Sequence, residues 1–292
     1  MKEKRIEHKT SRTAEINCVI RGISYLEKNE ELKCEDFIAP RMIPNKVKPF
    51  LGIGFLKKLF RNSLVPRGMF EYIVARTKYF DEIFQRVLRE SVEQIVIFGA
   101  GFDSRGIRFL DADTSTRLFE LDAPFTQEDK IKQFQKRGIT VPENVKLIPI
   151  DFSKESFKTK LLEAGFAPEK KTFFIMEGLT MYLDLRDIEE TWTSLLELAG
   201  EGSRILFDFV YDSVIKEEGL YYGEDDIRKR ADKTGEKWVF GIERDNIDQF
   251  LEAHNFKAIE FMDSQKLTTR YMPKLRAKMN ETHGIVFADC VI

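Results

Sequence analysis

The chain has 292 residues, of which 42% are hydrophobic and 33% charged, and its formal net charge at pH 7 is −2. That length accommodates one large α/β domain, and the near-neutral charge argues against a nucleic-acid-binding surface, which normally carries a basic excess. Three widely spaced cysteines (Cys18, Cys34 and Cys290) fit neither a disulfide framework nor a zinc site. The charged N-terminus lacks the apolar core of a signal peptide, and no stretch approaches the roughly 20 apolar residues of a membrane span. We therefore expect a cytoplasmic protein without a metal site, a nucleic-acid partner or membrane contact.

The first 92 residues are predicted to form a helical cap region. Their pattern is helical but irregular, and four prolines break it into pieces: Pro40, Pro44, Pro49 and Pro66. Residues 47–61 are basic and apolar, and a lid helix over a pocket explains this composition better than contact with a membrane surface.

From residue 93 onward, short apolar runs alternate with helix-like stretches. The runs cover residues 95–98, 117–121, 145–150, 172–176, 204–210, 256–261 and 285–288. Near-continuous apolarity over so few residues is typical of strands covered on both faces, and the alternation predicts a mainly parallel sheet. The last two runs lie close together, as in an antiparallel hairpin. We predict a single Rossmann-like α/β domain with seven strands and helices on both faces of the sheet.

Two helices of this region can be placed from their patterns. Residues 126–129, Thr-Gln-Glu-Asp, predict a helix start of the capping-box type, and Gly138 predicts the end of that helix. Further along, Ile188, Trp192 and Leu195 recur at helical spacing, which predicts a helix with one buried stripe.

A glycine turn follows the first predicted strand, at the edge where open α/β sheets bind ligands. Gly99 and Gly101 allow the chain to turn tightly and let the backbone approach a ligand closely. A dinucleotide-binding fingerprint would need a third glycine where Ser104 stands, which argues against a nicotinamide cofactor.

Acidic residues follow the next three strands. Asp122, or alternatively Glu120, stands where a carboxylate can accept hydrogen bonds from both hydroxyls of a ribose. Asp151 can accept from an adenine amine while Phe152 packs on the ring, or both can be structural. Glu177 places a further carboxylate at the fourth strand end. Carboxylates at successive strand ends, without a phosphate-loop lysine, suit a cationic nucleoside, and S-adenosylmethionine fits that description.

Six segments together resemble the leucine carboxyl methyltransferase family, which includes the tetracenomycin polyketide O-methyltransferase-like proteins. The most distinctive is the glycine segment at residues 96–108, Val-Ile-Phe-Gly-Ala-Gly-Phe-Asp-Ser-Arg-Gly-Ile-Arg. The others are SRTA at 11–14, ARTKYFD at 75–81, FELD at 119–122, DF at 151–152 and EGLTMYL at 177–183. The resemblance spans most of the first 183 residues.

The resemblance also implies roles for individual residues around S-adenosylmethionine. Arg76 would pair with the carboxylate of the methionyl tail, and Glu177 would bind the amino-acid end. Gly99 and Gly101 would line the cofactor, Asp122 would hold the ribose, and Asp151 and Phe152 would hold the adenine. Family members carry an N-terminal helical cap and an insertion after the fifth strand, for which the charged, tyrosine-rich residues 211–243 are the candidate here.

The function predicted from these features is S-adenosylmethionine-dependent O-methylation of a carboxyl or hydroxyl group, with a small molecule as the acceptor. The alternatives are methylation of a protein C-terminal carboxyl, a nicotinamide-dependent oxidoreductase, or a non-catalytic scaffold. The pattern singles out no general base, which favours an acceptor that is already ionised or acidic.

Several further residues have two interpretations. Asp103 and Arg105 form either a local ion pair or a cofactor contact, and Tyr182 either lines the acceptor pocket or belongs to the core. The three histidines, His8, His254 and His283, are scattered without a partner at telling spacing and are interpreted as structural.

Overall fold

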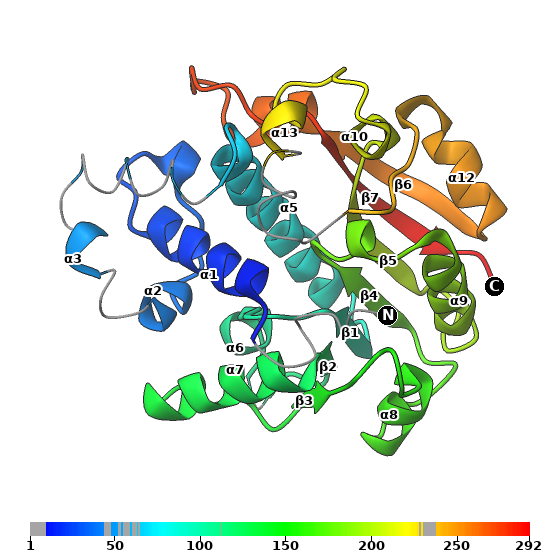
Figure 1. Cartoon of the computed structure of the whole chain (residues 1–292). Coiled ribbons are helices and arrows are strands. Elements are labelled where there is room, and N and C mark those ends of the chain that lie inside the picture. The colour runs from blue at the N-terminus through cyan, green and yellow to red at the C-terminus, as the bar shows by residue number, and fades with distance from the viewer. Residues whose placement is uncertain are drawn as a thin grey trace.

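The protein is built around one seven-stranded sheet (Figure 1). The computed structural model describes residues 10–43, 48–51, 54, 59, 63, 65–111, 113–227, 229 and 238–292. The strands are β1 (Gln94–Phe98), β2 (Arg117–Asp122), β3 (Val145–Pro149), β4 (Thr172–Met176), β5 (Arg204–Val210), β6 (Phe256–Asp263) and β7 (His283–Cys290). They lie in the order β3-β2-β1-β4-β5-β7-β6, with β7 antiparallel to both of its neighbours and the first five strands parallel. All seven predicted strands and the antiparallel end of the sheet are confirmed.

Helices cover both faces of the sheet, which explains why the strands read as continuous apolar runs. In β1, Ile95 and Ile97 join the core on the face covered by α5 (Met69–Arg89) and α13 (Ser264–Tyr271). The alternate residues Val96 and Phe98 join the opposite core, which includes side chains of α8 (Phe157–Glu163), α9 (Leu185–Leu196) and α12 (Ile247–Ala253). The predicted stripe of α9 is confirmed, since Ile188, Trp192 and Leu195 are its buried side chains.

The N-terminal region supplies the cap helices α1 (Arg12–Tyr25), α2 (Ala39–Met42) and α3 (Lys48–Leu51), with the short 3-10 helix η2 (Glu30–Leu32) between the first two. Figure 1 shows them in blue beside α5, away from α9 and α12. The start of α1 is fixed twice: the Ser11 hydroxyl accepts from the N–H of Ala14, and the Ser11 N–H donates to Thr126 Oγ1 at 3.0 Å. A Cβ on Gly101 would lie 2.9 Å from the Cβ of Ala14, so the close approach of α1 to this turn requires glycine.

The predicted start of the helix near residue 126 is wrong. Helix α7 (Pro124–Lys136) begins two residues earlier, after Ala123, with Pro124 at its start and no side-chain cap. Proline is favoured there because its fixed φ is helical and the N–H it lacks would have no helical partner. Thr126 is buried inside the first turn, while Gly138 follows the helix with φ 58°, as predicted.

Two predicted features lie partly outside the described residues. Of the proposed lid helix at residues 47–61, only 48–51, 54 and 59 are described, and of the proposed insertion at 211–243, residues 228 and 230–237 are not. The described ends of the insertion are joined, because Ile242 donates its N–H to Val210 O at 3.0 Å and accepts from Asp212 N at 3.2 Å. Within the part of the chain that the structure describes, no helix combines the length and apolarity needed to cross a bilayer.

Truncation of Trp192 tests the core between α9 and the sheet. Its side chain is 1% exposed and meets Phe250 and Phe256 edge to face, with ring centroids 5.6 and 5.1 Å away. We expect Trp192→Ala to lower the free energy of unfolding by about 3–5 kcal/mol, because it leaves a cavity among aromatic rings. Urea denaturation measures this. The control is Leu185→Ala on the same helix, where the side chain is 50% exposed and about 0.5 kcal/mol is expected. Equal losses in the two variants would contradict the packing described.

Candidate functional site

The glycine turn after β1 is folded against the end of β2. Gly99 and Gly101 have φ values of 60° and 51°, a conformation that favours glycine. Ala100 donates its N–H to Leu121 O at 3.1 Å, and Gly101 donates to Asp122 Oδ2 at 2.5 Å. The turn and the Asp122 carboxylate therefore form one rigid unit at the carboxyl edge of the sheet.

Asp122 and Glu120, the two candidates for a ribose contact, lie in different surroundings. Asp122 accepts at one oxygen from Gly101 and at the other from the N–H of Ala123 at 2.6 Å. Burial raises its pKa, and the two backbone hydrogen bonds oppose that shift. Glu120 is buried and paired with the equally buried Lys130 of α7. Asp122, not Glu120, is therefore the carboxylate joined to the glycine turn.

The end of β3 presents an aromatic ring beside an anchored carboxylate. Asp151 accepts hydrogen bonds from the Ser153 hydroxyl at 2.6 Å and from Lys154 Nζ at 2.7 Å. Hydrogen bonds from both side chains lower its pKa. The neighbouring Phe152 is 45% exposed, so its ring is available to a ligand rather than consumed by the core.

Glu177 and Arg76 meet at the end of β4. Arg76 Nε lies 3.0 Å from Glu177 Oε1, and Arg76 Nη1 donates to Asp208 Oδ2 of β5 at 2.7 Å. The other Glu177 oxygen lies 2.7 Å from Arg105 Nη1. Asp208 also accepts from Tyr72 Oη at 3.1 Å and from the N–H of Gly178 at 2.5 Å. Arg76 and Arg105, which belong to separate sequence motifs, are thus brought together around the carboxylate of Glu177.

These contacts belong to a larger, mostly buried set, which we call the arginine–carboxylate network. Its members are Arg21, Asp36, Arg76, Asp81, Asp103, Arg105, Arg108, Glu177 and Asp208. Arg105 and Arg108 share Asp81, with contacts of 2.8 and 2.6 Å. Arg21 of α1 lies 2.8 Å from Asp36, so the network crosses from the cap helices to the sheet.

Asp103 and Arg105 form the local ion pair that the sequence left as one alternative. Arg105 Nη1 lies 2.5 Å from Asp103 Oδ2, and the Arg105 N–H donates to Asp103 Oδ1 at 2.7 Å. Burial alone would raise the pKa of Asp103, but nearby positive charges, with Arg105 foremost, and the hydrogen bond from the Arg105 N–H together outweigh it and lower the pKa to about 2. Asp36 follows the same pattern, since burial is outweighed by Arg21 and Arg108 and its pKa is lowered.

A mainly apolar cavity of about 120 Å³ adjoins Arg76 and Gly178. We call it the apolar cavity. Its wall is formed by Arg12, Thr13, Ile16, Asn17, Val65, Pro66, Met69, Ile73, Arg76, Gly178, Met181, Tyr182, Ile227, Trp238 and His283. Tyr182 therefore lines a cavity beside the candidate cofactor site, as one of its two interpretations proposed.

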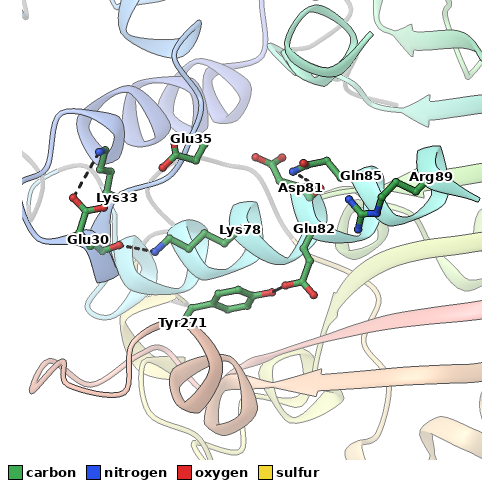
Figure 2. Close-up of a pocket in the computed structure, with 9 residues that line it drawn as sticks. All are labelled: Glu30, Lys33, Glu35, Lys78, Asp81, Glu82, Gln85, Arg89 and Tyr271. Carbon is green, nitrogen blue, oxygen red and sulfur yellow. Dashed lines mark hydrogen bonds and ion pairs between the residues drawn. The ribbon is translucent and has the colours of Figure 1, made fainter. Parts of the chain in front are cut away.

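A second cavity, of about 320 Å³, lies along α5 and is lined mainly by charged side chains (Figure 2). Lys78 donates to the backbone oxygens of Glu30 and Glu31 at 2.8 and 2.9 Å, and Tyr271 Oη donates to Glu82 at 2.6 Å. The predicted cofactor residues are absent from its lining, and it shares Asp81 with the arginine–carboxylate network.

Sequence reasoning missed Asp208 and interpreted His283 as structural, although both had detectable signals. Asp208 is the one acidic residue within the apolar run of β5. His283 begins β7 opposite Val210, the last residue of β5. Because β7 was expected to be antiparallel, its first residue had to fall at the carboxyl edge of the parallel strands, where ligands bind.

This strand order, with a glycine turn and carboxylates at the carboxyl edge, is the fold of the class I methyltransferases. The chain belongs to the leucine carboxyl methyltransferase family, whose model matches residues 17–195. The family resemblance found in the sequence is thereby confirmed.

Named relatives agree with this assignment, and a solved structure shares the fold. The chain is 24% identical over 218 residues to a Bacillus subtilis protein named "Putative S-adenosyl-L-methionine-dependent methyltransferase YktD", covering 75% of this chain and 71% of that protein. It is 29% identical over 247 residues to a Mycolicibacterium gilvum protein of the same description, covering 76% and 78%. The solved structure of a methyltransferase-like protein from Thermobifida fusca shares the fold, with a TM-score of 0.59 at 11% identity and coverage of 98% and 97%.

Removal of one network arginine tests how much stability depends on this cluster. Arg105→Met leaves Asp81, Asp103 and Glu177 short of a positive charge in a buried site. We expect the free energy of unfolding to fall by about 3–5 kcal/mol in urea titrations. The control is Arg186→Met, which removes an exposed pair with Glu190 at 3.6 Å and should cost about 0.5 kcal/mol or less. A loss at Arg105 no larger than that of the control would refute the role given to the network.

Proposed function

We propose that this protein transfers the methyl group of S-adenosylmethionine to a carboxyl or hydroxyl oxygen of a small molecule. The proposal rests on the contact between two compartments of the site, which are the carboxylate-lined edge of the sheet and the apolar cavity. The carboxylate-lined edge of the sheet meets the apolar cavity at Arg76 and Gly178, which line that cavity. A methyl donor in the first compartment would face an acceptor in the second.

The residues present fit this cofactor. The arginine–carboxylate network contains five carboxylates (Asp36, Asp81, Asp103, Glu177 and Asp208) and four arginines, and Asp122 adds one more acidic group at the same edge. Buried charge requires compensation, so this acidic excess favours a cationic ligand. When bound, the sulfonium supplies a methyl group already activated for displacement.

Each predicted site residue has a role in this arrangement. Asp122 would hold the ribose hydroxyls, since each of its oxygens accepts one backbone hydrogen bond and keeps a further lone pair. Phe152 would stack on the adenine beside Asp151, and Gly99 and Gly101 would allow close approach. Glu177 and Arg76 would bind the amino-acid end.

The apolar cavity would align the acceptor and exclude water. Met69, Ile73, Met181 and Trp238 supply apolar or aromatic walls beside Arg76. Methyl transfer is an in-line displacement, so alignment and dehydration of the acceptor provide much of the acceleration that the protein can offer. The small volume supports a compact acceptor group.

Family membership weighs against the other classes. A nicotinamide-dependent oxidoreductase would need a third glycine at residue 104, where the Ser104 hydroxyl instead accepts from Arg108 Nε at 2.8 Å. A non-catalytic scaffold would not need the buried acidic excess or the adjoining cavity.

Calorimetric titration with S-adenosylmethionine and S-adenosylhomocysteine tests the proposal. We expect both to bind, and we expect Asp122→Asn to weaken binding by about 10- to 100-fold, because the amide accepts fewer hydrogen bonds from the ribose. The control Asp248→Asn changes an exposed aspartate on α12 and should leave affinity unchanged. Absence of binding to the wild-type protein would rule out the proposed donor.

The adenine contact is tested separately by Phe152→Ala. Loss of a stacking ring should weaken cofactor binding by about 5- to 10-fold without changing the free energy of unfolding, because the ring is half-exposed. Phe37→Ala is the matched control, since Phe37 is 48% exposed and lies in the loop before α2. If both variants bind the cofactor as well as the wild type does, Phe152 does not contact the adenine.

A further inference from the structure

His283 occupies an unusual position for a residue interpreted as structural. It is buried at the start of β7 and lines the apolar cavity together with Trp238 and Arg76. Its ring packs against Tyr72, with centroids 4.3 Å apart, and against Trp238 edge to face at 5.6 Å. The side chain is therefore held firmly beside the place proposed for the acceptor.

The protonation of its two ring nitrogens follows from the neighbouring hydrogen bonds. The N–H of Thr282 can only donate, and it meets Asn280 Oδ1 at 3.1 Å, which identifies that atom as an acceptor. The Thr282 hydroxyl donates to the same oxygen at 2.5 Å and has no second proton to give. Towards His283 Nδ1, 2.7 Å away, Thr282 Oγ1 must therefore act as the acceptor. Nδ1 carries the proton.

The imidazole is neutral, so its other nitrogen is unprotonated. Burial, with a smaller contribution from the positive charge of Arg76, lowers the pKa of His283 to about 3. The charged and titratable groups around it are Arg76 and Tyr72 of α5 and Asp208 of β5 behind Tyr72. On the cavity wall they are Arg12 of α1 and Tyr182. Among the described residues, none is bonded to Nε2.

We propose that His283 Nε2 accepts a hydrogen bond from the methyl-accepting group, so that the acceptor is a hydroxyl and not a carboxylate. This inference rests on the proposed methyl transfer and narrows its substrate class. A lone pair facing the cavity attracts an O–H, whereas a carboxylate has only lone pairs to offer and would be repelled. The aromatic and apolar walls formed by Tyr182, Trp238 and Met181 suit a ring that carries the hydroxyl.

The hydrogen bond also gives the hydroxyl proton a destination. As the bond between the acceptor oxygen and the methyl carbon forms, the bond between that carbon and the sulfonium sulfur breaks. The hydroxyl proton passes to Nε2, and the positive charge moves from sulfur to the imidazole. A weakly basic imidazole suffices, because an oxygen that gains a methyl group while still protonated becomes a far stronger acid. The imidazolium then releases the proton to water after the products leave.

The ring protonation can be measured without any acceptor. In protein labelled with nitrogen-15 at histidine, His283→Gln identifies the His283 signals among those of the three histidines. We expect a proton on Nδ1, none on Nε2, and no titration of His283 between about pH 5 and 8, because the pKa is about 3. A proton on Nε2, or a charged ring in this range, would overturn the inference whatever the acceptor.

Acceptor choice is tested with phenol and benzoate, which share a ring and differ in the group offered. Methyl transfer from labelled S-adenosylmethionine, and binding to protein saturated with S-adenosylhomocysteine, should both favour phenol. His283→Asn keeps a donor near the Nδ1 position but loses Nε2, and should reduce transfer to phenol by about 100-fold. His283→Gln places an amide oxygen near the Nε2 position and should recover part of that loss.

Thr282→Val provides a second, opposite prediction. It removes the acceptor that holds the proton on Nδ1 while keeping the shape of a fully buried side chain. The ring can then carry its proton on Nε2, which should shift preference towards benzoate. Equal methyl transfer to phenol and benzoate by the wild type, no transfer to either, or a preference for benzoate would refute the inference. Cofactor binding by calorimetry in each variant separates that outcome from failure of the proposed function, which would abolish binding in the wild type as well.

Discussion

The contact of Glu177 with Arg76 and Arg105 is the interaction on which the site depends. Glu177 comes from the end of β4, Arg76 from α5, and Arg105 from the first residue of α6 (Arg105–Phe109). One carboxylate therefore joins three elements that approach the strand edge from different directions. An isolated buried ion pair repays its desolvation poorly. Here six of the nine charged side chains touch two or more oppositely charged partners, so the charges compensate one another as a group. The network therefore fixes the relative positions of the elements more than it adds stability.

This dependence explains the arrangement of the two compartments. Asp208 accepts from Arg76, from Tyr72 and from the N–H of Gly178, so the turn after β4 is held at the same point as the arginine. Gly178 has φ 67°, and a Cβ there would lie 3.3 Å from Arg76 Nη1. At the boundary between the cofactor edge and the apolar cavity, the guanidinium of Arg76 thus packs against the backbone of Gly178. A larger residue at 178 would push the two compartments apart.

The sheet was predictable from the sequence because burial on both faces leaves a pattern that needs no tertiary information. The residues at the strand ends were also predictable, because the end of a strand determines which edge of the sheet the side chains there reach. The start of α7 was misplaced because the capping pattern at Thr126 competed with Pro124, and proline prevailed. The network was beyond prediction: Arg21 and Asp36 lie far from Arg105 and Arg108 in the chain, and only the docking of α1 brings them together. Without knowledge of that docking, these charged residues would be interpreted as part of a solvent-exposed surface.

The role of His283 shows how topology alone can place a chemical group. Six of the seven strands run in one direction, so their carboxyl ends face the ligand edge and their amino ends face away. The reversal of β7 inverts that rule for one strand and brings its first residue, beside Val210, to the ligand edge. The residue before it, Thr282, then lies in the loop entering the strand, where its hydroxyl can bond both Asn280 and the His283 ring. The tautomer follows from the two contacts of the Thr282 hydroxyl, and the position of the ring follows from the direction of the strand.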